Sequence, residues 1–141
     1  MILKKIIFFL VFFCFVFTSK SQSITNYTVA DGLVTDFIEC IDIDVNNNVW
    51  IGTSQGIQRF DGVNWLNFNT SNSSQILSDN IKDIYCASNG DIWVGTDFGI
   101  NRYDGVNWYS YTATNSDLIS NQIKSIDEDL TSGLIWIGTN L

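Results

Sequence analysis

A block of sequence returns in this chain after 43 residues. Val49–Thr53 (VWIGT) reappears as Ile92–Thr96 (IWVGT) and again as Ile135–Thr139 (IWIGT). A second block, Gly56–Trp65 (GIQRFDGVNW), returns at the same spacing as Gly99–Trp108 (GINRYDGVNW). Repeats of this length are typical of propellers, solenoids and other arrays, in which one unit cannot bury its own apolar face and packs on a neighbour. The repeat predicts an architecture but names neither a ligand nor a reaction.

Each unit is predicted to form four short strands joined by turns. In the first unit these strands are residues 38–43, 49–53, 57–60 and 64–68. Asp61-Gly62 is a hairpin signal, because glycine adopts the positive φ that tight turns require. Four strands in about 40 residues, with recurring tryptophans, favour a β-propeller over leucine-rich or helical repeats. The predicted fold class is therefore all-β: a partial propeller of about two and a half four-stranded blades plus an N-terminal outer strand.

The repeat sets the expected domain boundaries. Residues 22–141 form an incomplete β-propeller, with a lone outer strand at 24–29, a blade at 33–70, a second blade at 77–113 and a half blade at 119–141. An N-terminal outer strand often completes the last blade of a closed ring, which removes exposed sheet edges. Closed propellers have typically 4 to 8 blades. We therefore expect residues 1–141 to be a fragment, whether from a truncated gene, a partial record or one piece of an assembly.

The first 21 residues have the pattern of a secretory signal peptide. Lys4 and Lys5 precede an unbroken apolar run at residues 6–17, and a small polar stretch follows it. The run is shorter than the roughly 20 residues of a spanning helix. We expect cleavage after Ser21, an exported protein (periplasmic, cell-surface or secreted) and no stable membrane insertion afterwards; an uncleaved anchor is the alternative.

Composition limits the chemistry of the mature chain. Without residues 1–21 it has four basic residues against 15 acidic ones, a net charge of −11. Such a surface repels nucleic acid, so no nucleic-acid partner is expected. The chain has no histidine, which removes the commonest general base and transition-metal ligand. With no nucleophile–base constellation and no metal cluster in the sequence, we expect no enzyme activity, no catalytic or metal-binding residues and no cofactor.

Taken together, the Trp-Ile-Gly-Thr and Arg-Phe-Asp-Gly blocks resemble the two-component regulator propeller repeats. The resemblance covers residues 25–141. It implies an exported β-propeller, either a sensor domain for signal transduction or a secreted surface protein. The function we expect is a non-enzymatic binding or sensory module, with an unknown small molecule or glycan as its ligand. The remaining blades, or another copy of the chain, are the expected partners. A propeller lyase or hydrolase whose catalytic residues lie beyond residue 141, and a gene remnant, remain alternatives.

Several patterns could mark sites, and each also has a structural interpretation. In residues 42–48 every second side chain carries an oxygen that could bind calcium, as in a calcium-binding loop. Asn47 occupies the position where such loops have glycine, so a polar hairpin is favoured. Glu128-Asp129 faintly resembles a tryptophan-docking motif. Asp61 and Asp104 occupy equivalent turns, and like environments do not separate an acid from a base. All three are interpreted as structural.

The recurring tryptophans and cysteines are also interpreted as structural. Trp50, Trp93 and Trp136 recur at one position and are predicted to pack between blades, although an aromatic ligand box is the alternative. The glycine two residues after each tryptophan is expected to allow close backbone approach or a β-bulge. Cys40 and Cys86 occupy non-equivalent positions, which favours two free thiols over a disulfide.

Overall fold

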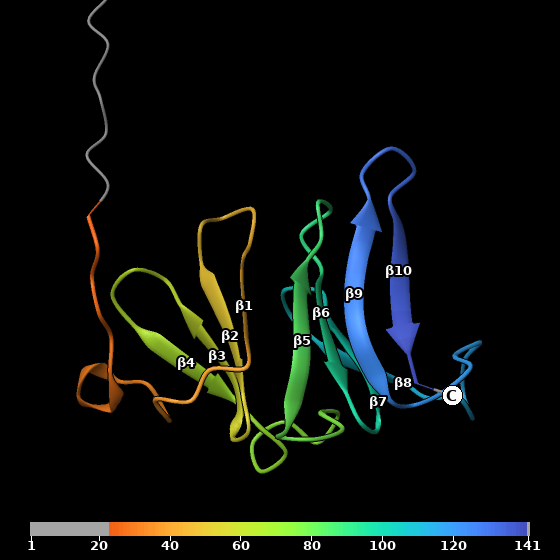
Figure 1. The fold of residues 1–141 in the computed structure, drawn as a ribbon, viewed down its shortest axis with the longest axis horizontal. Coiled ribbons are helices and arrows are strands. Elements are labelled where there is room, and N and C mark those ends of the chain that lie inside the picture. Colours follow the sequence, from red (N-terminus) through yellow and green to blue (C-terminus); the bar gives the residue numbers. More distant parts are fainter. Residues whose placement is uncertain (1–22, 141) are drawn as a thin grey trace, which may run out of the picture.

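The computed structural model describes residues 23–140, and their strands form three antiparallel sheets in simple chain order (Figure 1). The first blade is the sheet β1-β2-β3-β4, the second blade is β5-β6-β7-β8, and β9 pairs with β10 in a third sheet, the half blade. The strands are β1 (Cys40–Ile43), β2 (Val49–Thr53), β3 (Gly56–Phe60), β4 (Trp65–Phe68), β5 (Ile81–Cys86), β6 (Ile92–Thr96), β7 (Gly99–Tyr103), β8 (Trp108–Tyr111), β9 (Ile123–Asp129) and β10 (Leu134–Thr139). The predicted all-β partial propeller is confirmed.

The blades pack face against face around their first strands. β5 lies between β1 and β9 and contacts both (Figure 1). Side chains also link the blades through hydrogen bonds: the Asp42 carboxylate accepts the Cys86 N–H at 2.7 Å, and the Asp83 carboxylate accepts the Ile126 N–H at 2.6 Å. Each inner strand is therefore joined to the next by a side chain as well as by apolar packing.

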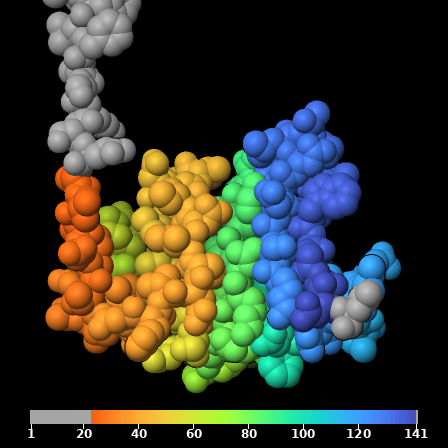
Figure 2. Space-filling model, in the orientation of Figure 1, coloured from red at the N-terminus to blue at the C-terminus, as the bar shows by residue number. Residues whose placement is uncertain are grey.

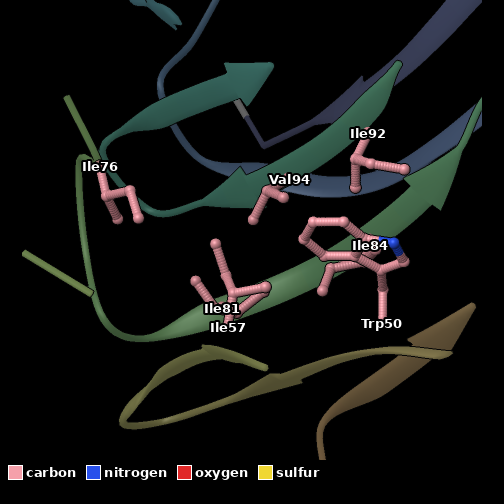
Figure 3. Close-up of a cluster of buried hydrophobic side chains, with 7 residues drawn as sticks. All are labelled: Trp50, Ile57, Ile76, Ile81, Ile84, Ile92 and Val94. Atoms are coloured by element: carbon pink, nitrogen blue, oxygen red, sulfur yellow. The ribbon is translucent and has the colours of Figure 1, made fainter. Parts of the chain in front are cut away.

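An apolar cluster fills the space between the first and second blades (Figure 3). Trp50 and Ile57 of the first blade meet Ile81 and Val94 of the second, and all four side chains are at most 1% exposed. A second cluster, built on Ile100, Ile123 and Ile126, repeats this arrangement between the second blade and β9. Because the two clusters use equivalent positions of the repeat, the same interface is built twice.

The repeated glycine is required by this interface. A Cβ atom on Gly95 would lie 2.5 Å from Cγ2 of Ile123 in the next sheet, and one on Gly52 would lie 2.6 Å from Cγ2 of Ile81. Gly95 is not among the glycines with positive φ, so backbone conformation does not demand it. The expected close approach is confirmed at these two positions: the side chain is absent so that the next blade can come near.

A buried amide in the third strand of each full blade holds the linker that precedes that blade. Gln58 and Asn101 are both 0% exposed. The Gln58 side chain accepts the Val34 N–H at 2.9 Å, and Asn101 accepts the Leu77 N–H at 3.0 Å. Each side-chain NH2 also donates to a carbonyl of the linker, that of Gly32 or of Gln75. Each linker is thereby held against the blade that follows it.

The three equivalent tryptophans differ in burial because the neighbouring blade differs. Trp50 is 1% exposed between two complete blades, Trp93 is half-buried against β9 and β10, and Trp136 is 65% exposed. Packing between blades is confirmed for Trp50 and Trp93. Trp136 has no blade on its outer side within the described residues.

The N-terminal segment differs from the predicted outer strand at 24–29. No strand is formed there, and a 3-10 turn at Val29–Asp31 follows. A strand needs a partner for its backbone hydrogen bonds, and the described residues provide none beside this segment. Tyr27 nevertheless packs edge-on against Phe60 and Trp65, with ring centroids 5.2 and 5.9 Å apart. The segment covers one end of the molecule, and the half blade forms the other (Figure 2).

Other sequence-based expectations have mixed outcomes. Cys40 and Cys86 are both free, as predicted. The expected signal peptide and its cleavage point lie outside the described residues. Within the described part of the chain, no helix is long and apolar enough to cross a membrane.

Substituting each of the three equivalent tryptophans by alanine should lower the free energy of unfolding by a different amount. Trp50→Ala should lower the free energy of unfolding by about 3–5 kcal/mol, because it removes a buried ring between blades. Trp136→Ala should change it by no more than about 0.5 kcal/mol, and Trp93→Ala should fall between them. Urea unfolding of each variant measures the order. Equal costs would contradict the packing account.

Candidate functional site

A cavity lies beside β10, against the second blade. It has a volume of about 380 Å³ and is lined mainly by apolar and aromatic side chains, among them Trp93, Ile100, Tyr111, Leu118, Ile135 and Ile137. Asp117 is its one charged lining residue. Such a lining suits an apolar occupant and supplies no acid–base pair.

A second, more polar hollow of about 650 Å³ lies along the outer strand β8. Trp108, Tyr109 and Tyr111 contribute aromatic side chains, and Gln75, Asn107 and Asn115 contribute amides. The Trp108 indole N–H is buried without a hydrogen-bond partner. The equivalent N–H of Trp65 donates to the Asp31 carbonyl at 2.9 Å. The hollow therefore combines aromatic side chains with polar groups at one place on the surface.

Asp61 and Asp104 serve the turns, as predicted. Each carboxylate accepts hydrogen bonds from the backbone N–H groups two and three residues ahead. The donors to Asp61 are Val63 at 2.9 Å and Asn64 at 2.7 Å, and those to Asp104 are the equivalent Val106 and Asn107. These hydrogen bonds lower the pKa of both carboxyl groups. Because both groups are held ionised in the same way, neither is suited to act as a general acid near neutral pH.

The calcium-like loop at 42–48 is a hairpin held by its own hydrogen bonds. The Asp44 carboxylate accepts backbone N–H groups of Asn46 and Asn48, the Asn48 amide, and the Trp50 indole N–H at 2.9 Å. Burial raises the pKa of Asp44, but these hydrogen bonds outweigh it, and the net direction is downward. Among residues 23–140 no group of three or more acidic or cysteine side chains is arranged to hold a metal ion.

Glu128 joins the half blade to the second blade. Its carboxylate accepts the Ser88 backbone N–H at 2.8 Å and the Ser88 hydroxyl at 2.7 Å, and its side chain is 9% exposed. Asp129 instead accepts hydrogen bonds from Thr131 and Ser132 within its own turn. The pair thus has two separate structural roles. The sequence did not reveal the Ser88 contact, because it joins positions 40 residues apart.

The two thiols have little nucleophilic character. Burial raises the pKa of Cys40 to about 12, with the Asp83 carboxylate adding to the effect. Burial likewise raises the pKa of Cys86, with Asp42 and Asp44 nearby. A thiol must ionise to act as a nucleophile, so both cysteines serve as core residues at neutral pH.

Part of the second blade matches a known family. Residues 75–98 fit the model of the two component regulator propeller. These residues comprise the linker before the second blade and its strands β5 and β6. The match confirms the resemblance at the Trp93–Thr96 block, and the Arg102–Gly105 block lies outside the matched residues. No curated protein sequence matches the chain.

Solved structures of propeller domains are similar to the chain. The extracellular domain of BT3049 from B. thetaiotaomicron, assigned to a hybrid two component system, is 25% identical with a TM-score of 0.71; the match covers 83% of this chain and 16% of that one. The extracellular domain of BT4673 from the same organism, assigned to a one component system, is 23% identical with a TM-score of 0.62, over 87% of this chain and 18% of its own.

A third similar structure comes from a surface protein. PorZ, an essential bacterial surface component of the type-IX secretion system of Porphyromonas gingivalis, is 23% identical with a TM-score of 0.56. The match covers 72% of this chain and 16% of PorZ. The chain thus spans about a sixth of the length of these structures, and the likenesses at 23% identity support the fold alone.

Lowering the pH should weaken the contact between the second blade and β9. Hydrogen bonds from the Ser88 hydroxyl and N–H hold the pKa of Glu128 below its ordinary value of 4.5. A lowered carboxyl pKa contributes stability that is present above the unfolded-state pKa and is lost as pH falls through the folded-state pKa. The urea midpoint should therefore fall between about pH 6 and pH 3.

The variant Glu128→Gln isolates this contribution. The amide does not titrate, so the urea midpoint of the variant should depend less steeply on pH than that of the parent chain. An unchanged slope would show that Glu128 adds nothing to the acid sensitivity.

Proposed function

We propose that this chain supplies blades of an exported, non-enzymatic propeller that acts as a binding or sensory module. The observation that carries the proposal is the family match over residues 75–98, which falls on a blade whose packing repeats along the chain. The similarity to the extracellular domain of BT3049, from a hybrid two component system, supports a sensory role. The apolar segment at residues 6–17 supports export.

The chemistry of the described residues supports a binding role over catalysis. The carboxylates of Asp44, Asp61, Asp104 and Glu128 are occupied by hydrogen bonds in turns and between blades. The sequence has no histidine to pair with a nucleophile. These groups hold the scaffold together, which leaves aromatic and amide side chains to contact a ligand.

The ligand class we propose is a small polar molecule or a glycan. Hydroxyl groups of such a ligand could exchange hydrogen bonds with the amides of the outer hollow. Apolar faces of a sugar ring could pack on the aromatic side chains. A surface scaffold without a diffusible ligand is the second candidate, favoured by the fold shared with PorZ.

Two measurements test export and binding. Cells expressing the full sequence should release or display a chain whose N-terminal mass shows cleavage after Ser21, whereas an uncleaved chain kept in the cytoplasm would overturn the proposal. A panel of oligosaccharides and small polyols is then screened by thermal shift. A ligand at 100 times its Kd should add about 2.7 kcal/mol of stability.

A matched pair of variants locates the ligand. Trp108→Ala removes an aromatic ring that lines the hollow, and Trp65→Ala removes the equivalent ring of the first blade, which does not line it. We expect Trp108→Ala to weaken binding and Trp65→Ala to leave it unchanged. Equal effects would exclude the outer hollow, and the absence of any stabilising compound would favour the scaffold.

A further inference from the structure

Two equivalent turns of the first and second blades differ in the residues at their tips. The turn between β5 and β6 carries Asn89-Gly90-Asp91, and the turn between β1 and β2, at the same end of the molecule (Figure 1), carries asparagine at 46–48. In both turns the N–H of the middle residue donates to the carbonyl three residues before it, at 2.9 Å, and the middle residue has a positive φ. The two turns therefore share their backbone hydrogen bonds and differ in their side chains.

The Asn89 side chain is exposed, and Asp91 binds both ends of its amide. The Asp91 N–H donates to Oδ1 of Asn89 at 2.9 Å, and Nδ2 of Asn89 donates to the Asp91 carboxylate at 3.0 Å. In the first blade the corresponding N–H, that of Asn48, donates to Asp44 instead of Asn46. A hydrogen bond to Oδ1 stabilises the negative charge that develops on this oxygen when a nucleophile adds to the amide carbon.

A nucleophile lies one residue ahead, in the backbone nitrogen of Gly90. Glycine has the backbone freedom to bring this nitrogen to Cγ of Asn89. A Cβ atom on Gly90 would have Val45 as its nearest neighbour, at 3.9 Å, so the surroundings leave room for this movement. In the first turn the following residue is Asn47, whose side chain restricts the same movement. The turn hydrogen bond has to open in both cases, so it favours neither turn.

We propose that Asn89 is a site of spontaneous modification, at which the side-chain amide is hydrolysed through a cyclic imide formed with Gly90. Hydroxide removes the proton of the Gly90 N–H, the nitrogen bonds to Cγ of Asn89, and Nδ2 takes up a proton and leaves as ammonia. Water then opens the ring at either carbonyl carbon. Opening at Cγ gives aspartate, and opening at the main-chain carbon gives isoaspartate, in which the chain continues through Cγ. Overall, water is consumed and ammonia is released.

The modification changes the charge of the second blade. Aspartate at this position places a carboxylate where Nδ2 donated a hydrogen bond to Asp91. Asp91 also pairs with Arg102 at 3.6 Å, and the Arg102 guanidinium lies 4.9 Å from the ring centroid of Tyr109 on the outer strand. Neighbouring carboxylates repel each other, and here they compete for the same guanidinium. The inference goes beyond the proposed function and does not rest on it.

The test follows both turns in one sample. The folded full chain is incubated in mildly alkaline buffer, and portions taken over time are unfolded and cleaved after lysine and arginine at mildly acidic pH. Asn89 and Asn46 then lie in different peptides, which end at Arg102 and at Arg59. Mass spectrometry measures the change from amide to acid at each asparagine, and an isoaspartate-specific methyltransferase measures the second product.

We expect the amide of Asn89 to be lost progressively, with formation of isoaspartate, before any loss at Asn46 is detected. Gly90→Asn gives the second turn the residue of the first and should abolish the reaction at Asn89, since asparagine tolerates the positive φ of this position. The matched variant Asn47→Gly should make Asn46 reactive, but more slowly than Asn89, because the Asn48 N–H donates to Asp44 and not to the Asn46 side chain.

Equal rates at Asn89 and Asn46 in the parent chain would overturn the inference, as would a reaction at Asn89 that occurs only in the urea-unfolded chain. If Asn46 of the Asn47→Gly variant reacts as fast as Asn89, the role given to Asp91 is wrong. None of these results depends on export or on a ligand, so failure here can be told from failure of the proposed function.

Discussion

The apolar face of each blade is buried against the apolar face of the next blade. The other local features of the repeat make this contact possible. Trp50 is buried because the second blade covers it, and its counterpart Trp136 is exposed where no described blade follows. Gly52 and Gly95, in the first two of these blocks, let the next sheet approach. Burial of apolar surface drives such contacts, and in a repeat protein stability adds up from neighbour to neighbour. The interface between blades, more than any single sheet, is the unit of this fold.

Polar groups make the stacking specific. Carboxylates of Asp42, Asp83 and Glu128 each accept a backbone N–H from the neighbouring blade or its turn. Buried amides at Gln58 and Asn101 hold the linkers. Buried polar groups are costly unless they find partners, so these contacts favour one arrangement of successive blades. Much of the acidic character of the chain therefore belongs to its architecture.

The repeat period was enough to predict the fold class and the strand order, since Trp-Ile-Gly-Thr and Asp-Gly signals recur at fixed spacing. The same period predicted structural roles for Asp61, Asp104 and the tryptophans. It did not predict the Ser88–Glu128 contact or the hydrogen bonds from the buried Gln58 and Asn101 amides to the linkers. These contacts join residues that are far apart in the sequence, and no sequence motif marks them. The outer strand expected at 24–29 does not form, because the described residues contain no partner strand for it. Tyr27 nevertheless packs on Phe60 and Trp65 much as Phe68 packs on Tyr103 and Trp108.

The central claim, that close approach of successive blades dictates the sequence, is tested most directly by a double-mutant cycle. Gly95→Ala should cost about 1–3 kcal/mol in the free energy of unfolding, because the new methyl group would clash with Ile123. In an Ile123→Ala background the same substitution should cost much less, which gives a coupling of about 1 kcal/mol or more. Additive costs would contradict the account, since they would mean that Gly95 is needed for its own strand and not for its neighbour.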